Sequence, residues 1–507
     1  MTSTSLRIST LLLILLMLIP AVAGCGGAAS DDDNITPVTS ASGDTSETDA
    51  GEYVDTRFVG VNFNGKEFRV QTSVDAYDAT NANEFIAGSG EENGEVVNDA
   101  VFKRNLTVEE LLNVKLKFTE SEYTYSTAEG EIRKIVMAGD DLFDLIINDV
   151  RSVIALTDEN IVWNVANFDN FDYSKPYWYW DSMEDMSLLP GKTFVMAGDY
   201  FMDVIRSCHA LFYNKNMCEG YFKDANYINN IVLDDAWTYE KATEIVSQCY
   251  SDLNGDGKPN EGDQFGMIGH GTWGTLIPFV GSSGVTFIDK TQDPPAFCFD
   301  NERSIDYVNA LNALYWDPAV LTTITDSADF NLGLRNMFGE ENALICCYQR
   351  LNDLSKMRNF EFDAAIIPYP KLYESDAYHT SIHDTTEMGV IPVTCMDLEF
   401  ASTCIEVLNR ETSVMVMPEY YEVALKIKYT HDQIAAQMID LVHDTISSAF
   451  PLAYDMSLNS VMLTSFTDTV AAKSTDFMST YAGKIAGAEA NLLKMIEGIE
   501  ATTDPVF

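Results

Sequence analysis

Short apolar runs alternate with amphipathic stretches along most of the sequence, and this alternation is the strongest constraint on its fold. The apolar or alternating runs at 68–72, 114–118, 143–147, 343–348 and 362–367 are typical of strands. Apolar residues recur at helical spacing in 100–112, 129–137, 237–250, 304–315, 399–408 and 431–446. Strands interleaved with helices predict an α/β protein, and the run at 143–147 is expected to be a buried parallel strand.

The composition predicts a large folded body and excludes polyanionic partners. Of the 507 residues, 46% are hydrophobic and 11% are aromatic, which is enough apolar material for two lobes or more. The chain carries 78 acidic and 31 basic residues, for a formal net charge of −47. Such a charge repels phosphate backbones and anionic lipid headgroups, so nucleic acid is excluded as a partner.

The start of the sequence predicts export and a lipid anchor. An unbroken apolar run at 11–19 is too short to cross a bilayer as a mature helix. The small residues at 22–24 lead directly into Cys25, and this segment resembles the lipobox of bacterial lipoproteins. We expect a signal peptide at 1–24, lipid on Cys25 and a disordered polar tether at 25–56. The alternative is an ordinary secretory cleavage site that happens to contain a cysteine. The other cysteines show no framework spacing, and most are expected to be buried thiols.

A calcium-binding pattern follows the helix expected at 237–250. Side-chain oxygens at loop positions 1, 3, 5, 9 and 12, with glycine at position 6, match a loop in which a hard cation takes six or more oxygen ligands. The expected ligands are Asp252, Asn254, Asp256, Lys258 through its backbone carbonyl, Asn260 and Asp263. Asp263 stands where a bidentate Glu is usual. We expect a structural Ca²⁺, and a polar turn without metal is the alternative.

The segment 269–274 matches the glycine pattern of a dinucleotide-binding turn, but its context argues against that site. Such a turn must open a helix, whereas a proline and two glycines follow within 278–284 and predict a loop. An exported protein also meets little nicotinamide cofactor. We expect a glycine-rich loop that carries His270 and Trp273 into a cleft, since glycines let the backbone approach a ligand closely.

The aromatic run Tyr-Trp-Tyr-Trp at 177–180 is the densest in the chain. Flat rings with polar edges suit the apolar faces of sugars, which makes Trp178 and Trp180 candidate ligand contacts. Alternate residues of an extended segment face opposite ways, so packing of two of the four rings into the core is an equal alternative.

A polar segment holds His379 and His383, with Asp376 and Asp384 beside them. On a helix these side chains could hold a transition metal, but the neighbouring Ser and Thr residues favour a polar crossover segment. No phosphate-binding GxxxxGK(S/T), HExxH or GxSxG motif occurs, so no familiar catalytic motif points to an enzyme.

Beyond Cys25, several segments stand in a specific order along the chain. They are Asn98–Asn105, Val108–Glu110, Phe143–Ile146, Phe212–Lys215, Trp237–Thr238, Asp263–Gly266 and Tyr420–Lys426. Together they resemble the extracellular solute-binding lipoproteins of bacterial ABC importers, specifically family 1, whose members mostly bind sugars. The resemblance covers nearly the whole mature chain.

This resemblance implies a two-lobed α/β fold of the periplasmic-binding-protein type II, with a hinge and an interlobe ligand cleft. Lobe one would hold 57–199 and 386–450, and lobe two would hold 200–385 and 451–507. The candidate ligand-binding residues are Asn148, Asp149 and Arg151 after the strand at 143–147, His270, Trp273, Tyr348 and Arg350 opposite them, Asp384 of the crossover segment, and Trp178 and Trp180.

The function that the resemblance implies is capture of an extracellular carbohydrate, an oligosaccharide, with hinge closure and delivery to a membrane permease. The protein would act as a monomer on the extracytoplasmic face of a bacterial membrane, and it would break no bond. A peptide or other solute as ligand, and a sensory or adhesive surface lipoprotein, remain alternatives. An exported polysaccharide-degrading enzyme is another, and it would need two carboxylates about 5 to 10 Å apart across a cleft.

Overall fold

The computed structural model describes residues 56–73, 83–123, 127–322, 332–357, 359–421, 433–447 and 449–505, without the side chains of residues 272, 273, 332 and 348. From Thr56 onward the chain belongs to one compact unit. Cys25, the expected signal peptide and the expected tether up to residue 55 lie outside the described residues, so those expectations stay predictions.

The first sheet has four strands in the order β11-β3-β1-β2. Their bounds are β1 Lys66–Ser73, β2 Val114–Ser121, β3 Leu145–Asp149 and β11 Glu387–Val390. β1 pairs in parallel with β2 and with β3, whereas β11 arrives from much later in the chain and pairs antiparallel with β3. Every residue of β3 is buried. The buried parallel strand expected at 143–147 is therefore confirmed, displaced by two residues.

The second sheet has five strands in the order β10-β4-β9-β5-β8. Their bounds are β4 His209–Asn214, β5 Phe265–Ile268, β8 Val320–Leu321, β9 Ala343–Arg350 and β10 Ala364–Ile367. β9 pairs antiparallel with β4 and parallel with β5, so the sheet is mixed. A separate antiparallel pair consists of β6 Ile288–Asp289 and β7 Ala296–Phe297.

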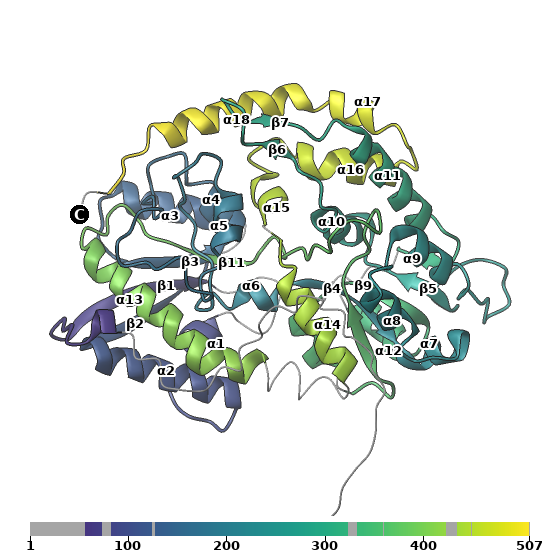
Figure 1. Ribbon diagram of the computed structural model, residues 1–507, viewed down its shortest axis with the longest axis horizontal. Coiled ribbons are helices and arrows are strands. Elements are labelled where there is room, and N and C mark those ends of the chain that lie inside the picture. Colours follow the sequence, from purple (N-terminus) through teal and green to yellow (C-terminus); the bar gives the residue numbers. More distant parts are fainter. Residues whose placement is uncertain are drawn as a thin grey trace, which may run out of the picture. The chain divides into compact units, whose positions relative to one another are not determined.

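Helices cover both sheets, as Figure 1 shows. Around the first sheet are α1 Asn83–Ile86, α2 Val96–Leu112, α3 Ala128–Met137, α4 Val150–Ile154 and α13 Leu398–Glu411, which continues as a π-helical turn Thr412–Val416. Around the second are α7 Lys215–Phe222, α8 Tyr227–Leu233, α9 Tyr239–Val246, α10 Thr272–Gly281, α11 Glu302–Tyr315, α12 Leu332–Gly339, α14 Gln433–Asp444, α16 Val461–Ala471 and α17 Phe477–Ala482. The remaining α-helices are α5 Trp180–Met186, α6 Asp203–Arg206, α15 Phe450–Tyr454 and α18 Ile485–Glu500, and short 3₁₀ turns occupy Thr56–Phe58 and Leu351–Met357.

The strands and helices expected from periodicity are all present, with ends shifted by a few residues. The cysteine prediction is also confirmed, because the eight described cysteines are free thiols and seven of them are buried. Desolvation raises the pKa of the buried Cys208 and Cys347 thiols above their usual range, so these groups stay protonated and act as small apolar side chains.

The loop expected after residue 274 was wrong, because α10 runs through Pro278. Proline inside a helix costs about 3 kcal/mol, since it removes a backbone hydrogen bond and crowds the preceding turn. Against this, Leu276, Ile277, Phe279 and Val280 are each at most 4% exposed. Burying one such side chain is worth about 1.5–3 kcal/mol, so packing against β9 and α16 outweighs the helix-breaking residue.

Three segments, around residues 207–209, 380–383 and 446, are joined to one another by backbone contacts. His209 N donates to the Ser381 carbonyl at 2.8 Å, and His383 N donates to the Ser207 carbonyl at 2.9 Å. Thr380 also forms a parallel bridge with Ile446. The polar crossover expected around His383 is therefore part of the connection between the two sheets.

Two later segments contact residues of the other lobe from the one to which the sequence assigned them. Helix α14 contacts β10 and α8 at the second sheet. Asp504, which follows α18, was assigned to lobe two. It accepts hydrogen bonds from Asn164 and Lys192, both in the part of the chain assigned to lobe one. The expected lobe boundaries at 385/386 and 450/451 stay a prediction.

Gly389 in β11 offers a direct test of the first sheet. A Cβ built there would overlap the ring of Phe201. We expect Gly389→Ala to lower the free energy of unfolding by about 1–3 kcal/mol, as overpacking does. The matched control is Gly130→Ala, at an exposed position of α3 with open space around it, which should raise stability by about 0.5–1 kcal/mol. Urea denaturation of both variants measures the change in the free energy of unfolding. Equal changes would contradict the packing described for Gly389.

Candidate functional site

The residues expected at the carboxyl end of β3 are buried and bonded within the protein. Asn148 Nδ2 donates to the Tyr123 carbonyl at 3.1 Å, and Asn148 Oδ1 accepts from Asp149 N at 2.9 Å. The Asp149 carboxylate caps α4 by accepting from Ser152 N at 3.0 Å and Ser152 Oγ at 2.7 Å. Burial raises the pKa of Asp149. The polar atoms of these two side chains are thus largely used to shape the start of α4.

Arg151 and Asp384, two of the expected ligand residues, form an ion pair at 2.7 Å. The other carboxylate oxygen of Asp384 lies 3.1 Å from His383 Nδ1. The ring of His383 in turn lies 5.4 Å from that of His209, whose strand position pairs with Arg350. Burial lowers the pKa of His209 well below its usual value, so its ring is neutral. The structure therefore joins two expected residues, Arg151 and Asp384, directly, and Arg350 lies beside His209 in the neighbouring strand pair.

Among the described residues, no group of three or more His, Cys, Asp or Glu side chains is placed to hold a metal ion. In the expected calcium loop, Asp252 accepts from Gly255 N at 2.6 Å and from Gly257 N at 3.0 Å. Asp263 is fully buried and accepts from Leu253 N at 3.2 Å and Tyr250 OH at 3.3 Å. Calcium in this loop stays a prediction.

The remaining members of the predicted loop lie close together. Asn260 Nδ2 donates to Asp256 Oδ2 at 3.0 Å and to the Lys258 carbonyl at 2.8 Å. Asn254 Nδ2 donates to Asn260 Oδ1 at 2.9 Å. Positive φ angles of 74° at Gly255 and 71° at Gly257 make the tight turn possible.

The glycine-rich segment after β5 does open a helix, contrary to the expectation above. Its glycines nevertheless approach protein atoms. A Cβ on Gly269 would overlap Thr275 and Cys347, and one on Gly274 would lie 3.0 Å from His270 Nδ1. A dinucleotide site also needs an acid about 20 residues beyond its glycines. Asp289 stands at that distance, but it accepts a hydrogen bond from Thr291 N at 2.9 Å within its own turn. Close packing thus accounts for Gly269 and Gly274, and a φ angle of 53° accounts for Gly271, without a dinucleotide.

Three further candidates from the sequence are placed as follows. His270 is partly exposed, and burial lowers its pKa. Trp273 lies in the first turn of α10 and Tyr348 lies in β9, but their side chains fall outside the described part of the structure. Their proposed contact with ligand is therefore not tested.

Two of the four rings in the aromatic run are buried, as the core-packing alternative expected, but they are neighbours in the sequence rather than alternate residues. Tyr177 and Trp178 are 6% and 4% exposed. Tyr177 OH donates to Glu406 Oε1 at 2.7 Å, and Trp178 Nε1 donates to Glu406 Oε2 at 2.8 Å. Trp178 is mainly a core residue held by the carboxylate of α13. Trp180 is half-buried and stacks on Tyr173 with ring centroids 4.2 Å apart and an interplanar angle of 30°.

The stacked pair lines a cavity of about 450 Å³, which we call the aromatic cavity. One wall is the segment from residue 173 to 182, and the other is the end of α14 and the turn after it. The lining residues are Tyr173, Ser174, Lys175, Pro176, Trp178, Tyr179, Trp180, Asp181, Ser182, His443, Asp444 and Ile446. Its volume falls within the range of about 300–1,000 Å³ usual for small-molecule sites.

Polar groups surround the rings of the aromatic cavity. Tyr179 OH donates to Asp199 Oδ1 at 2.8 Å, and burial raises the pKa of that carboxyl to about 6. His443 Nδ1 lies 3.0 Å from Asp444 Oδ1. Tyr173, His443 and Asp444 were not expected as site residues from the sequence. Tyr173 was detectable as part of the local aromatic enrichment, but no local pattern marks the end of α14.

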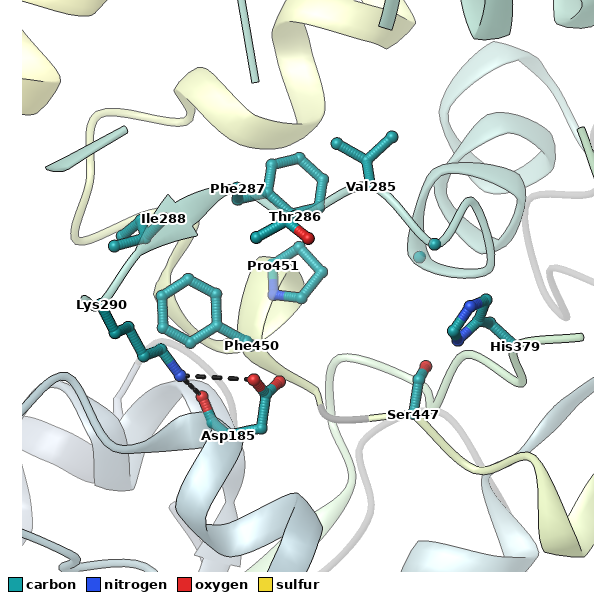
Figure 2. A pocket seen from close by; sticks show the side chains of 12 residues that line it. Asp185, Val285, Thr286, Phe287, Ile288, Lys290, His379, Ser447, Phe450 and Pro451 are labelled. Carbon is teal, nitrogen blue, oxygen red and sulfur yellow. Dashed lines mark hydrogen bonds and ion pairs between the residues drawn. The ribbon is translucent and has the colours of Figure 1, made fainter. Parts of the chain in front are cut away.

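A second hollow of about 190 Å³ lies between α5, the segment from 281 to 290 and α15. Figure 2 shows Lys290 directed at Asp185, beside the ring of Phe450, with His379 and Ser447 on the other side. Lys290 Nζ donates to the Asp185 carbonyl, and it lies 3.4 Å from the carboxylate and 4.9 Å from the centre of the Phe450 ring. Desolvation lowers the pKa of Lys290. The ammonium group of Lys290 is therefore already bound by protein groups within this hollow.

No protein-family model and no curated protein matches the sequence. Solved structures match its fold at low identity. An ABC transporter solute-binding protein from Thermotoga lettingae bound to α-D-tagatose has a TM-score of 0.52 at 12% identity, covering 84% of this chain and 100% of that one. A cyclo/maltodextrin-binding protein complexed with maltotetraose has a TM-score of 0.54 at 10% identity, covering 87% and 99%. UspC of M. tuberculosis has a TM-score of 0.52 at 12% identity, covering 84% and 100%.

The chain has the fold of periplasmic solute-binding proteins. The fold class expected from the sequence is thus confirmed. The first two proteins with this fold are named for binding a solute, not for catalysis. In the part of the chain that the structure describes, no helix is both long enough and apolar enough to cross a bilayer.

The Glu406 carboxylate can be tested as the anchor of the aromatic segment. We expect Glu406→Ala to lower the free energy of unfolding by about 2–5 kcal/mol, because it leaves the buried donors of Tyr177 and Trp178 without an acceptor. The control Glu399→Ala removes an exposed carboxylate from the same helix and should change stability by less than about 0.5 kcal/mol. Denaturant titration monitored by tryptophan fluorescence reports both values. A loss below about 1 kcal/mol at Glu406 would show that this anchor is not needed.

Proposed function

We propose that the protein is the substrate-binding component of a bacterial ABC importer and that it binds an extracellular carbohydrate, an oligosaccharide. The observation that carries this proposal is the aromatic cavity of about 450 Å³ with its stacked Tyr173 and Trp180. Aromatic faces suit the apolar faces of sugar rings, and the polar ring edges and nearby carboxylates can take hydroxyl hydrogen bonds. The fold shared with sugar-bound binding proteins supports the same assignment.

The proposal includes an exported protein held at a membrane. The apolar leader and the lipobox-like sequence before Cys25 support a lipid anchor on the extracytoplasmic face. Delivery of the solute would then need a membrane permease as partner. The connecting segments at 203–209, 380–387 and 445–447 are the place where the two sheet-bearing parts would hinge during closure.

Thermal melts against mono- and oligosaccharides, amino acids and short peptides test this function. A ligand at a hundred times its Kd adds about 2.7 kcal/mol to the free energy of unfolding, which gives a measurable rise in Tm. We expect a saturable rise with one oligosaccharide class and no new reducing ends. A rise with peptides alone would overturn the carbohydrate assignment, and product formation at a useful turnover would overturn the binding-protein assignment.

Trp180 provides the sharpest residue-level test of the cavity. We expect Trp180→Ala to weaken oligosaccharide binding at least about tenfold, since an aromatic anchor in a pocket commonly contributes more than 1.4 kcal/mol. Trp316→Ala removes a tryptophan that is 40% exposed and lies outside the aromatic cavity, so it should leave the affinity unchanged. Isothermal titration calorimetry on the two variants measures the difference. Equal affinities would remove this cavity as the binding site.

We also propose a structural Ca²⁺ in the loop from Asp252 to Asp263, supported by its oxygen spacing and its glycine at the sixth position. Added Ca²⁺ should raise the Tm, and EDTA should reverse the rise; at a hundred times Kd the gain is about 2.7 kcal/mol. Asp252→Asn should reduce the response, whereas Asp169→Asn, which removes an exposed carboxylate elsewhere, should not. An unchanged Tm together with no calcium in elemental analysis would contradict the proposal.

A further inference from the structure

The aromatic cavity carries negative charge on both of its walls. Asp181, in the first turn of α5, is exposed on one wall. Asp444, the last residue of α14, has a side chain that is 73% exposed on the other. Lys175 is the sole lysine or arginine among the described lining residues, and it lies 3.7 Å from Asp172, outside the lining. The charge that faces a ligand is therefore mainly that of the two carboxylates.

The orientation of α14 adds to this negative charge. The helix spans Gln433–Asp444, and its carboxyl-terminal end forms part of the cavity wall. The aligned peptide dipoles give such an end about half a negative elementary charge, which favours a cation nearby. The last turn carries both His443, whose Nδ1 lies 3.0 Å from Asp444 Oδ1, and the largely exposed carboxylate of Asp444. Helix end and carboxylate thus act in the same direction.

The remaining lining groups suit an ammonium group. The faces of Trp180 and Tyr173 belong to the ring types that attract cations through their π-electrons, and a cation within about 6 Å of the ring centre gains from this attraction. Ser182 Oγ is buried at the cavity and has no hydrogen-bond partner among the described residues. A hydroxyl oxygen of this kind can accept a hydrogen bond from an N–H group.

The net charge of the whole chain also favours a cationic ligand. A formal net charge of −47 produces a negative potential that repels anionic solutes and attracts cationic ones. Salt weakens this long-range effect, with a screening length of about 10 Å at 0.1 M ionic strength. An anionic sugar such as a uronic acid would meet repulsion both at a distance and at the two carboxylates.

We propose that the ligand of the aromatic cavity is a cationic saccharide, an amino sugar or its oligomer with a protonated amine. This inference rests on the proposed carbohydrate-binding function and specifies its substrate class. The sugar ring stacks on an aromatic face of the cavity, and the ammonium group lies toward the carboxylates of Asp181 and Asp444.

Three tetrasaccharides of the same linkage test the proposal on the full protein: the β-1,4-linked tetramers of glucosamine, N-acetylglucosamine and glucose. Calorimetry at low salt should give at least about tenfold tighter binding of the glucosamine tetramer, and this advantage should shrink as salt rises. Equal or weaker binding of the glucosamine tetramer would overturn the cationic ligand and leave the carbohydrate function intact. If none of these and no other saccharide binds, the proposed function itself fails.

Charge-removing variants locate the effect. Asp444→Asn and Asp181→Asn should each reduce the preference for the glucosamine tetramer several-fold while changing the affinity for the glucose tetramer little. Asp169→Asn removes one exposed negative charge near this segment but outside the cavity lining, and it should leave the preference unchanged. A preference that falls equally in all three variants would assign it to the overall charge and overturn the proposed contact.

Discussion

The buried carboxylate of Glu406 is the interaction on which the arrangement of the aromatic segment depends. Its side chain is fully buried in α13 and takes hydrogen bonds from Tyr177 OH and Trp178 Nε1, while the Arg57 guanidinium lies 2.7 Å away. A buried charge with several donors is held firmly, because moving any donor leaves part of the charge unpaired. Three distant parts of the chain, at residues 57, 177–178 and 406, are thereby fixed to one another.

This anchor explains how a flexible-looking aromatic loop becomes one wall of a cavity. Trp178 is fixed in the core, and two residues later Trp180, at the start of α5, stacks on Tyr173. Tyr173 and Trp178 also contact each other edge to face at 5.3 Å. The core ring therefore positions the pair that faces the cavity. Because these rings are set before a ligand arrives, binding would lose little side-chain entropy in ordering them.

The sequence was sufficient for the fold, since periodicity reports burial and burial decides strands and helices. It failed at α10, where the proline penalty was visible locally but the compensating contacts with β9 and α16 were not. For the site, the end of the strand at 143–147 pointed to Arg151 and the polar crossover segment contained Asp384, but neither local pattern could show that the two side chains form an ion pair. His443 and Asp444 lie far from the aromatic run in sequence, and only the packing of α14 brings them to it.

The crossover and the aromatic cavity differ in how many of their polar groups are already bound within the protein. At the crossover, the charged side chains are paired with one another, so a ligand there would have to break the Arg151–Asp384 ion pair at 2.7 Å before gaining any contact. Breaking a partly buried pair leaves an uncompensated charge, which is costly. At the aromatic cavity the rings need no partner, and the Ser182 Oγ has no hydrogen-bond partner among the described residues. This difference supports the aromatic cavity as the proposed binding site, whereas the Arg151–Asp384 pair links α4 to the crossover segment.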